Sequence, residues 1–273
     1  IMLMFALLVV QTVRVVLRDR AHRIEVEAEL QTAHDMQMSL MPNVSPDIEG
    51  IDIAGRCIPA SQVGGDFFQY FDHSGKLSLG LADVTGHAMA AAIPVVLFNG
   101  VLESQMRRSD PIKLLFGELN DTLHNVLDSR TFVCFTMGEL DLNTRVFSLS
   151  NGGCPYPYHY NAETGNIVEL QIDAYPLGVR AATDYEVIDV QLQDGDYVVF
   201  CSDGIAEAEN EAGEQFGYET TEATIRQACV DGLSAEATID RILEGVDAFC
   251  GAALQGDDMT CVVVRIEETT ERV

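Results

Sequence analysis

The pattern of hydrophobic and polar positions divides the chain into an N-terminal helical stretch and a longer region of mixed strands and helices. Residues 11–41 contain no Gly or Pro, so they predict one helix, which Pro42 ends. The stretch PNVSPDIEG that follows predicts a linker. The helix carries positions with the 4-3-4-3 spacing of a coiled-coil seam, over fewer heptads than the roughly three or four that define one. These positions are Val26, Leu30, Ala33, Gln37 and Leu40.

Beyond the linker, short apolar runs predict strands and longer amphipathic runs predict helices. Because these come in blocks, the pattern favours an α+β fold with mainly antiparallel sheet. Residues 132–153 predict a hairpin that turns at 142–144. Other strands are predicted at 51–60, 77–83, 157–160, 167–170 and 186–190, between Gly195 and Gly204, and at 257–266. Helices are predicted at 87–106, with Pro94 at a kink or near the start, and at 110–127, 216–230 and 234–250.

Composition narrows the possible partners. The chain has 273 residues, of which 47% are hydrophobic, so it can bury a sizeable core. Its 43 acidic and 16 basic residues give a net charge of −27, which argues against binding to nucleic acid. An acidic surface suits a protein that concentrates divalent cations, although it is more often a solubility feature.

The seven cysteines include no Cys-x-x-Cys pair, so a zinc site or a disulfide framework is not expected, and a reducing cytoplasm fits best. Cys134, Cys201 and Cys261 lie inside apolar runs and are interpreted as small core residues.

The first ten residues form an uninterrupted apolar run. As a helix this run would rise about 15 Å, half of a bilayer core, so it cannot span a membrane alone. Four arginines follow within residues 14–23, as at the cytoplasmic flank of a membrane span. Because the chain begins at Ile1 rather than Met, we expect a fragment that starts at the end of a membrane helix. The alternative is an amphipathic dimerisation helix.

Carboxylates recur where predicted strands end or begin. Asp83 and Asp203 each close an apolar run, whereas Asp257 and Asp258 open one, and Asp66 follows two glycines. If these strands are neighbours, their ends bring the carboxylates together. Clustered carboxylates repel one another, and oxygen ligands without Cys or His favour Mg²⁺, Mn²⁺ or Ca²⁺. The alternative is a set of independent turn aspartates.

Six motifs follow one another along the chain: VGGDFF, LADVTGHAMAAA, SNGG, PLGV, GDYVVFCSDGIAEAENEAGEQFG and GDDMTCVVVRI. Their order resembles that of bacterial PPM-type phosphatases, and most of all that of the SpoIIE/RsbU-like serine phosphatases. The helical lead-in AHDMQMSLMP also resembles that group, so the resemblance covers about residues 33–267.

The resemblance implies a PPM-type sandwich of two mainly antiparallel β-sheets flanked by α-helices and preceded by an N-terminal helix. Residues 1–41 would then be a membrane-proximal stub and linker helix, 42–267 the phosphatase domain, and 268–273 a tail. It also implies a site for two Mn²⁺ or Mg²⁺ ions, and hydrolysis of phosphoserine or phosphothreonine by in-line attack of a metal-bridging hydroxide.

By motif match, Asp83 bridges both metals and the carbonyl of Val84 binds one of them. Asp203 and Asp257 complete the shell of the other metal, and Asp66 holds metal-bound water or a metal directly. Asp258 is either a further ligand or an orienting neighbour.

His87 could protonate the leaving serine oxygen; the alternative is a histidine that packs or caps at a helix start.

The chain departs from the family pattern at several positions near the motifs, though none of them removes a predicted metal ligand. These departures concern substrate recognition rather than catalysis. Gln69, Ala88 and Cys154 stand where Asp, Gly and His are usual. Ser61 stands where eukaryotic relatives carry a phosphate-binding Arg, and Arg56 is a possible substitute.

The resemblance implies the output domain of a bacterial signalling protein, acting on a phosphorylated STAS-domain anti-sigma-factor antagonist. We expect a cytoplasmic catalytic domain anchored in the inner membrane, with a possible homodimer through residues 11–41. Two alternatives remain: a catalytically inactive adaptor that binds such a partner, and a metal-dependent hydrolase of small phosphorylated molecules.

Overall fold

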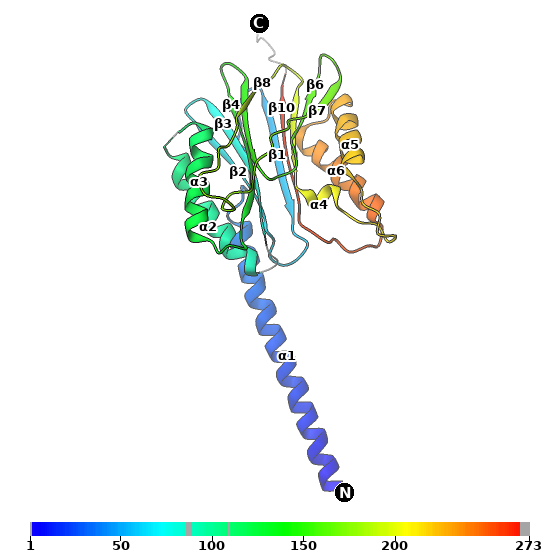
Figure 1. Cartoon of the computed structure of the whole chain (residues 1–273). Coiled ribbons are helices and arrows are strands. Elements are labelled where there is room, and N and C mark those ends of the chain that lie inside the picture. Colours follow the sequence, from blue (N-terminus) through cyan, green and yellow to red (C-terminus); the bar gives the residue numbers. More distant parts are fainter. Residues whose placement is uncertain (1, 86–88, 109, 268–273) are drawn as a thin grey trace.

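Two antiparallel sheets face each other and carry helices on both outer surfaces (Figure 1). The computed structural model describes residues 2–85, 89–108 and 110–267. One long helix, α1 (Met2–Met38), projects away from one end of this sandwich. The sandwich predicted from the resemblance is therefore confirmed.

The first sheet, sheet A, has the strand order β1-β10-β9-β6-β7. Its central strands read YVVFC and MTCVVVRI, and they are almost wholly buried because both of their faces are covered. The strands are β1 (Ile51–Ile58), β10 (Met259–Ile266), β9 (Tyr197–Cys201), β6 (Tyr158–Asn161) and β7 (Asn166–Glu169).

The second sheet, sheet B, has the order β2-β3-β4-β5-β8, in which β2–β3 and β4–β5 are hairpins and two helices connect β3 to β4. The turn predicted at 142–144 is confirmed between β4 and β5. The strands are β2 (Asp66–His73), β3 (Lys76–Val84), β4 (Val133–Asp141), β5 (Val146–Gly152) and β8 (Ile188–Gln191).

Two helices cover each outer face. α2 (Met89–Met106), which contains Pro94, and α3 (Ile112–Val126) lie over sheet B. α5 (Tyr218–Val230) and α6 (Ala235–Cys250) lie over sheet A. The short α4 (Asp203–Ala206) follows β9 directly.

Two hydrophobic cores hold these layers together. One lies between the sheets and under α2 and α3; there the Phe147 and Phe200 rings meet across the layers with centroids 6.4 Å apart. The other lies between sheet A and the helix pair α5–α6. Cys201 and Cys261 belong to this second core, as their apolar surroundings predict, and Cys134 packs partly buried against the first.

The N-terminal helix differs from its sequence-based description. It is continuous from Met2 and ends at Met38, so the apolar run and the arginine-rich stretch share one helix. Side chains such as Phe5, Val15 and Leu17 are exposed by 60% or more. Within the described residues, no helix is both long enough and apolar enough to cross a membrane.

Candidate active site

The β2–β3 hairpin brings two of the predicted site residues side by side. Asp66 is the first residue of β2 and lies opposite Asp83, near the end of β3, in the antiparallel register. Residues opposite each other on antiparallel strands project from the same face, with Cβ atoms about 4.5–5.5 Å apart. Asp66 is 3% exposed and Asp83 is half-buried. The two carboxylates therefore share one face at the end of sheet B.

Sheet A supplies three more carboxylates at one of its own ends. β9 and β10 are antiparallel neighbours, with Cys201 opposite Cys261, so the end of β9 adjoins the start of β10. Asp203 comes just after β9, and Asp257 and Asp258 come just before β10. The strand-end pattern in the sequence therefore does reflect neighbouring strands.

Asp258 joins the two sheets. Its Oδ2 accepts hydrogen bonds from the backbone N–H groups of Gly65 (2.6 Å) and Asp66 (3.2 Å), at the start of β2. Its Oδ1 accepts one from the N–H of Ala60 at 2.8 Å. Because both oxygens are engaged by backbone donors, this carboxylate holds the loop before β2 against the loop before β10.

The two glycines of VGGDFF allow this close approach. A Cβ atom on Gly64 would lie 2.0 Å from Oδ2 of Asp258, and one on Gly65 would lie 2.5 Å from the carbonyl oxygen of Val84. Neither distance leaves room for a side chain. The two glycines therefore let the loop before β2 pack directly against Asp258 and the end of β3, next to Asp66 and Asp83.

Like charges and burial together disfavour ionisation of these carboxylates. Burial, then Asp203, Asp257 and Asp258, raise the pKa of Asp83 to about 7. Burial and Asp83 hold the pKa of Asp66 well above its usual range. Burial and Asp257 raise the pKa of Asp203. The five aspartates thus interact electrostatically, as expected for residues of one site.

The oxygen atoms of these aspartates are the kind of ligand that a hard divalent cation prefers. Among them, Oδ2 of Asp66 is buried without a hydrogen-bond partner. A cavity of about 210 Å³ lies against Asp83, Asp257 and Asp258, and none of the described residues that line it is basic. In the described parts of the chain, however, no three Asp, Glu, His or Cys side chains stand close enough together to hold an ion.

Other positions singled out in the sequence fall in different surroundings. Arg56 donates to Glu236 and Asp240 on α6, so this guanidinium is committed to ion pairs away from the site and does not fill the phosphate-binding place suggested for it. Ser61 lines the 210 Å³ cavity, although its hydroxyl donates to the carbonyl of Val63. His87 and Ala88 lie outside the described residues.

One contact with the site was not predicted from the sequence. Gln37, assigned to the coiled-coil seam, is 4% exposed and forms two hydrogen bonds with the backbone of Gly64. His34, one helical turn earlier, contacts the carbonyl of Gln62 at 2.6 Å. The only available signal was a polar residue at a seam position, which cannot by itself indicate its partner.

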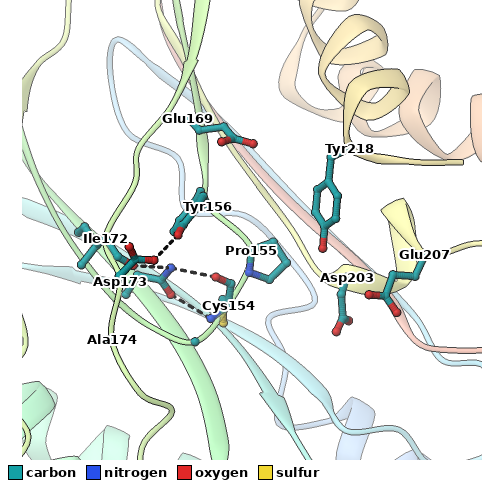
Figure 2. A pocket seen from close by; sticks show the side chains of 12 residues that line it. Cys154, Pro155, Tyr156, Glu169, Ile172, Asp173, Ala174, Asp203, Glu207 and Tyr218 are labelled. Atoms are coloured by element: carbon teal, nitrogen blue, oxygen red, sulfur yellow. Dashed lines mark hydrogen bonds between the residues drawn. The ribbon is translucent and has the colours of Figure 1, made fainter. Parts of the chain in front are cut away.

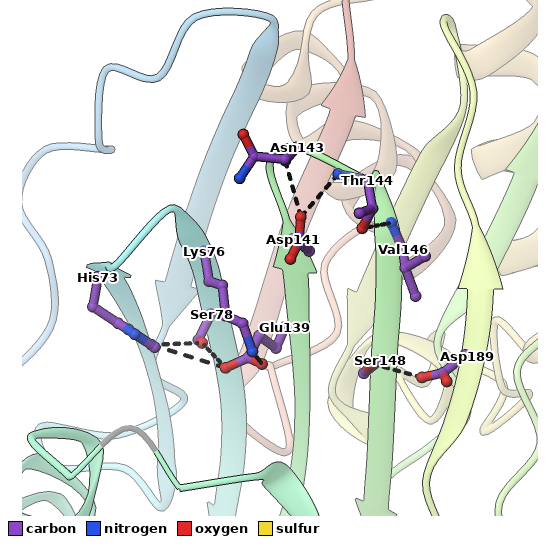
Figure 3. A network of polar contacts seen from close by, with 10 residues as sticks. All are labelled: His73, Lys76, Ser78, Glu139, Asp141, Asn143, Thr144, Val146, Ser148 and Asp189. Atoms are coloured by element: carbon purple, nitrogen blue, oxygen red, sulfur yellow. Dashed lines mark hydrogen bonds and ion pairs between the residues drawn. The ribbon is translucent and has the colours of Figure 1, made fainter.

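A second polar cluster involves His73, Ser78 and Glu139 at the opposite end of sheet B (Figure 3). Nε2 of His73 lies 3.2 Å from Oγ of Ser78, which lies 3.3 Å from Oε2 of Glu139. Nε2 of His73 also lies 3.9 Å from Oε2 of Glu139, whereas Nδ1 is buried without a partner, so the carboxylate does not lie on the ring nitrogen opposite the serine as in a catalytic triad. Lys76 pairs with Glu139 at 2.6 Å, and the cluster is structural.

Comparison with known proteins connects this geometry to a family. Residues 73–267 match the family "Stage II sporulation protein E (SpoIIE)". The chain belongs to this family. It is thereby a PP2C-type phosphoprotein phosphatase by family and fold.

Individual relatives are distant in sequence. Phosphoserine phosphatase RsbU of Bacillus subtilis (strain 168) is 23% identical over 241 residues, which are 88% of this chain and 71% of RsbU. The SiaA-PP2C domain of Pseudomonas aeruginosa superposes with a TM-score of 0.79 at 21% identity, covering 90% of this chain and 99% of that domain. RsbX, solved in complex with magnesium, gives a TM-score of 0.62 at 14% identity, covering 81% and 98%. These two likenesses establish the fold.

Proposed function

We propose that this protein is a metal-dependent protein-serine/threonine phosphatase that hydrolyses phosphoserine on a signalling protein. The observation that carries the proposal is the convergence of five aspartates from both sheets at one edge, where burial and the neighbouring carboxylates raise the pKa of Asp66, Asp83 and Asp203. A set of independent turn aspartates would have no reason to interact in this way. Membership of the SpoIIE family and the likeness to RsbU support the same activity.

Two Mg²⁺ or Mn²⁺ ions at this edge would supply an activated water and neutralise charge on the phosphoryl group during in-line attack. Asp66, Asp83, Asp203 and Asp257, with the carbonyl of Val84, are the groups we assign to hold them. The cavity beside Asp83 has no basic lining among its described residues, so those residues offer the substrate phosphate no cation.

The remaining groups position these ligands. Asp258 fixes the backbone of Gly65 and Asp66, and so sets where the first carboxylate of β2 stands. We assign it the orienting role rather than that of a ligand, because both of its oxygens already accept hydrogen bonds. His87 stays a proposed proton donor to the leaving oxygen.

The SpoIIE/RsbU-like resemblance also supports a phosphorylated STAS-domain regulator as the partner, with this domain as the output of a sensor. The exposed apolar side chains of α1 support a role for that helix in contacts outside this domain. We assign residues 11–41 to a homodimer contact, and the apolar run before them to the end of a membrane anchor in the inner membrane.

The test is hydrolysis of p-nitrophenyl phosphate by the whole chain with Mn²⁺, with Mg²⁺ and with EDTA. We expect activity that needs a divalent ion and falls at least 100-fold in Asp83→Asn, since removing one electrostatic element commonly costs about that much. Glu163→Gln, an exposed acidic residue on the β6–β7 turn, is the matched control and should retain activity.

Three results would contradict the proposal. Activity that survives EDTA would exclude a metal mechanism. A folded protein that binds neither ion by calorimetry, and hydrolyses neither p-nitrophenyl phosphate nor a phosphopeptide, would favour the inactive adaptor instead. Hydrolysis of nucleotides in preference to phosphopeptides would favour the small-molecule hydrolase.

A further inference from the structure

A second and larger cavity, of about 440 Å³, opens beside Asp203 (Figure 2). One side comes from residues 153–156 and 169–174, which contribute Tyr156, Glu169 and Asp173. The other side comes from α4 and the start of α5, which contribute Asp203, Glu207 and Tyr218. Because Asp203 belongs to the aspartate site as well, the cavity adjoins the place where we expect the phosphate.

The electric charge of this cavity is uncompensated. Four carboxylates line it, and no Lys or Arg is among the described residues of its wall. Because we assign Asp203 to the metal site, Glu169, Asp173 and Glu207 are the carboxylates left to meet a positive group. Elsewhere the chain pairs its cations with acids, as Lys76 does with Glu139. Within the described chain, none of the four carboxylates forms an ion pair; Glu169 accepts one hydrogen bond from the amide of Gln171 at 3.0 Å. The cavity is therefore attractive to a positive group.

The carboxylates and the tyrosines face a common space. The hydroxyl of Tyr156 donates to Asp173. Tyr218 is 46% exposed, and after burial the charges of Glu207, Asp203 and Glu169 raise its pKa. In Figure 2 its ring points toward Asp203 and Glu207, across the cavity from Tyr156.

Shape and lining distinguish between possible cations. The cavity is far larger than a single ion needs, and Asp203 is the one of its four carboxylates that belongs to the aspartate site. Pro155, Ile172 and the two tyrosine rings add apolar surface. A Lys or Arg side chain matches this lining, because its aliphatic stem packs on apolar surface while its charged end meets carboxylates and ring faces.

We propose that this cavity is a specificity subsite that binds a Lys or Arg side chain of the phosphoprotein substrate, next to the phosphoserine at the aspartate site. The inference rests on the proposed function, because the phosphoserine fixes the substrate beside Asp203. The net charge of −27 adds a long-range reason, since this surface repels acidic substrates and attracts basic ones.

The experiment compares two phosphoserine peptides that differ only in Arg or Ala beside the phosphoserine, with the Arg placed at each flanking position in turn. For the wild-type chain with Mn²⁺ we expect kcat/KM to favour the best Arg peptide about fivefold at low salt, as for one exposed ion pair with a cation–π contact. The ratio should shrink toward one at high salt because screening weakens exposed charge pairs.

Variants assign the preference to the cavity. Glu169→Gln should lower the Arg/Ala ratio, and Glu169→Lys should favour a peptide with Glu at the same position. That reversal is a gain which misfolding cannot produce. Glu163→Gln, which lies outside the cavity, should keep the wild-type ratio.

Equal kcat/KM for the Arg and Ala peptides in the wild type would overturn the inference while leaving the phosphatase assignment in place. An Arg preference that Glu169→Lys leaves intact would also overturn it. If the wild type hydrolyses neither the peptides nor p-nitrophenyl phosphate with either ion, the proposed function fails, and the subsite fails with it.

Discussion

At the scale of single residues, the site brings carboxylates so close together that their ionised forms are disfavoured. Asp83 has a pKa of about 7 because burial and three other aspartates disfavour its ionised form. An aspartate in an unfolded chain has a pKa of about 3.9. The folded state therefore binds this proton more tightly than the unfolded state, and this contribution to stability is lost as the pH rises from about 4 to about 7.

Replacing Asp83 by Asn should therefore stabilise the cation-free protein while abolishing activity. At pH 8 in EDTA we expect the free energy of unfolding to rise by roughly 1–3 kcal/mol, with no gain at pH 4. Urea unfolding at both pH values measures this. A variant that is less stable than the wild type at pH 8 would show that Asp83 makes a favourable contact that outweighs the repulsion.

Asp258 and Asp257 are adjacent in sequence but should respond differently to substitution. Asp258→Asn puts an N–H₂ group where one carboxylate oxygen accepts a backbone N–H, so it should lower the free energy of unfolding by about 1–3 kcal/mol in EDTA. Asp257→Asn should instead weaken Mn²⁺ binding, with little loss of stability in EDTA. Denaturation and calorimetry on both variants test this; the reverse pattern would make Asp258 the ligand.

At the scale of elements, the end of α1 reaches the site through one side chain. Gln37 bonds to both backbone groups of Gly64, at 2.7 Å and 3.1 Å. Gly64 precedes Gly65, whose N–H is held by Asp258. A displacement of the helix end would therefore pull on the loop that positions Asp66.

Gln37→Ala should lower the free energy of unfolding by about 2–3 kcal/mol, because a buried N–H and a buried carbonyl lose their partner. It should also lower phosphatase activity by loosening the Gly64 loop. Gln31→Ala is the matched control on the same helix, since its exposed side chain donates to Asp35 on that helix. Equal effects of the two substitutions on unfolding and activity would remove the proposed link.

At the scale of the whole molecule, the acidic surface and the aspartate site should make stability depend on divalent cations. A cation at 100 times its dissociation constant stabilises the folded state by about 2.7 kcal/mol, which raises Tm by several degrees in a chain of this size. Thermal unfolding with Mn²⁺ and with NaCl at equal ionic strength separates binding from screening of the net charge of −27. The difference should vanish in Asp83→Asn; a rise of the same size in NaCl would contradict specific binding.

Periodicity and turn residues determined most of the elements. The β4–β5 hairpin, the helix pair α5–α6 and the closing strand β10 follow from the local spacing of apolar residues and from the turn residues between them. β2 was missed, because FFQYF is too aromatic on both faces to show alternation, and its strand form depends on pairing with β3.

The sequence by itself also determined the family, and the aspartates at the ends of apolar runs, because both are properties of residue order. Only the tertiary structure decided that these aspartates come from two sheets. It also decided that both carboxylate oxygens of Asp258 accept hydrogen bonds from the loop before β2, and that Gln37, at a coiled-coil seam position, binds the backbone of Gly64. Residues 65 and 258 are far apart in the chain. No local pattern specifies such a contact, since it depends on how the strands and layers pack.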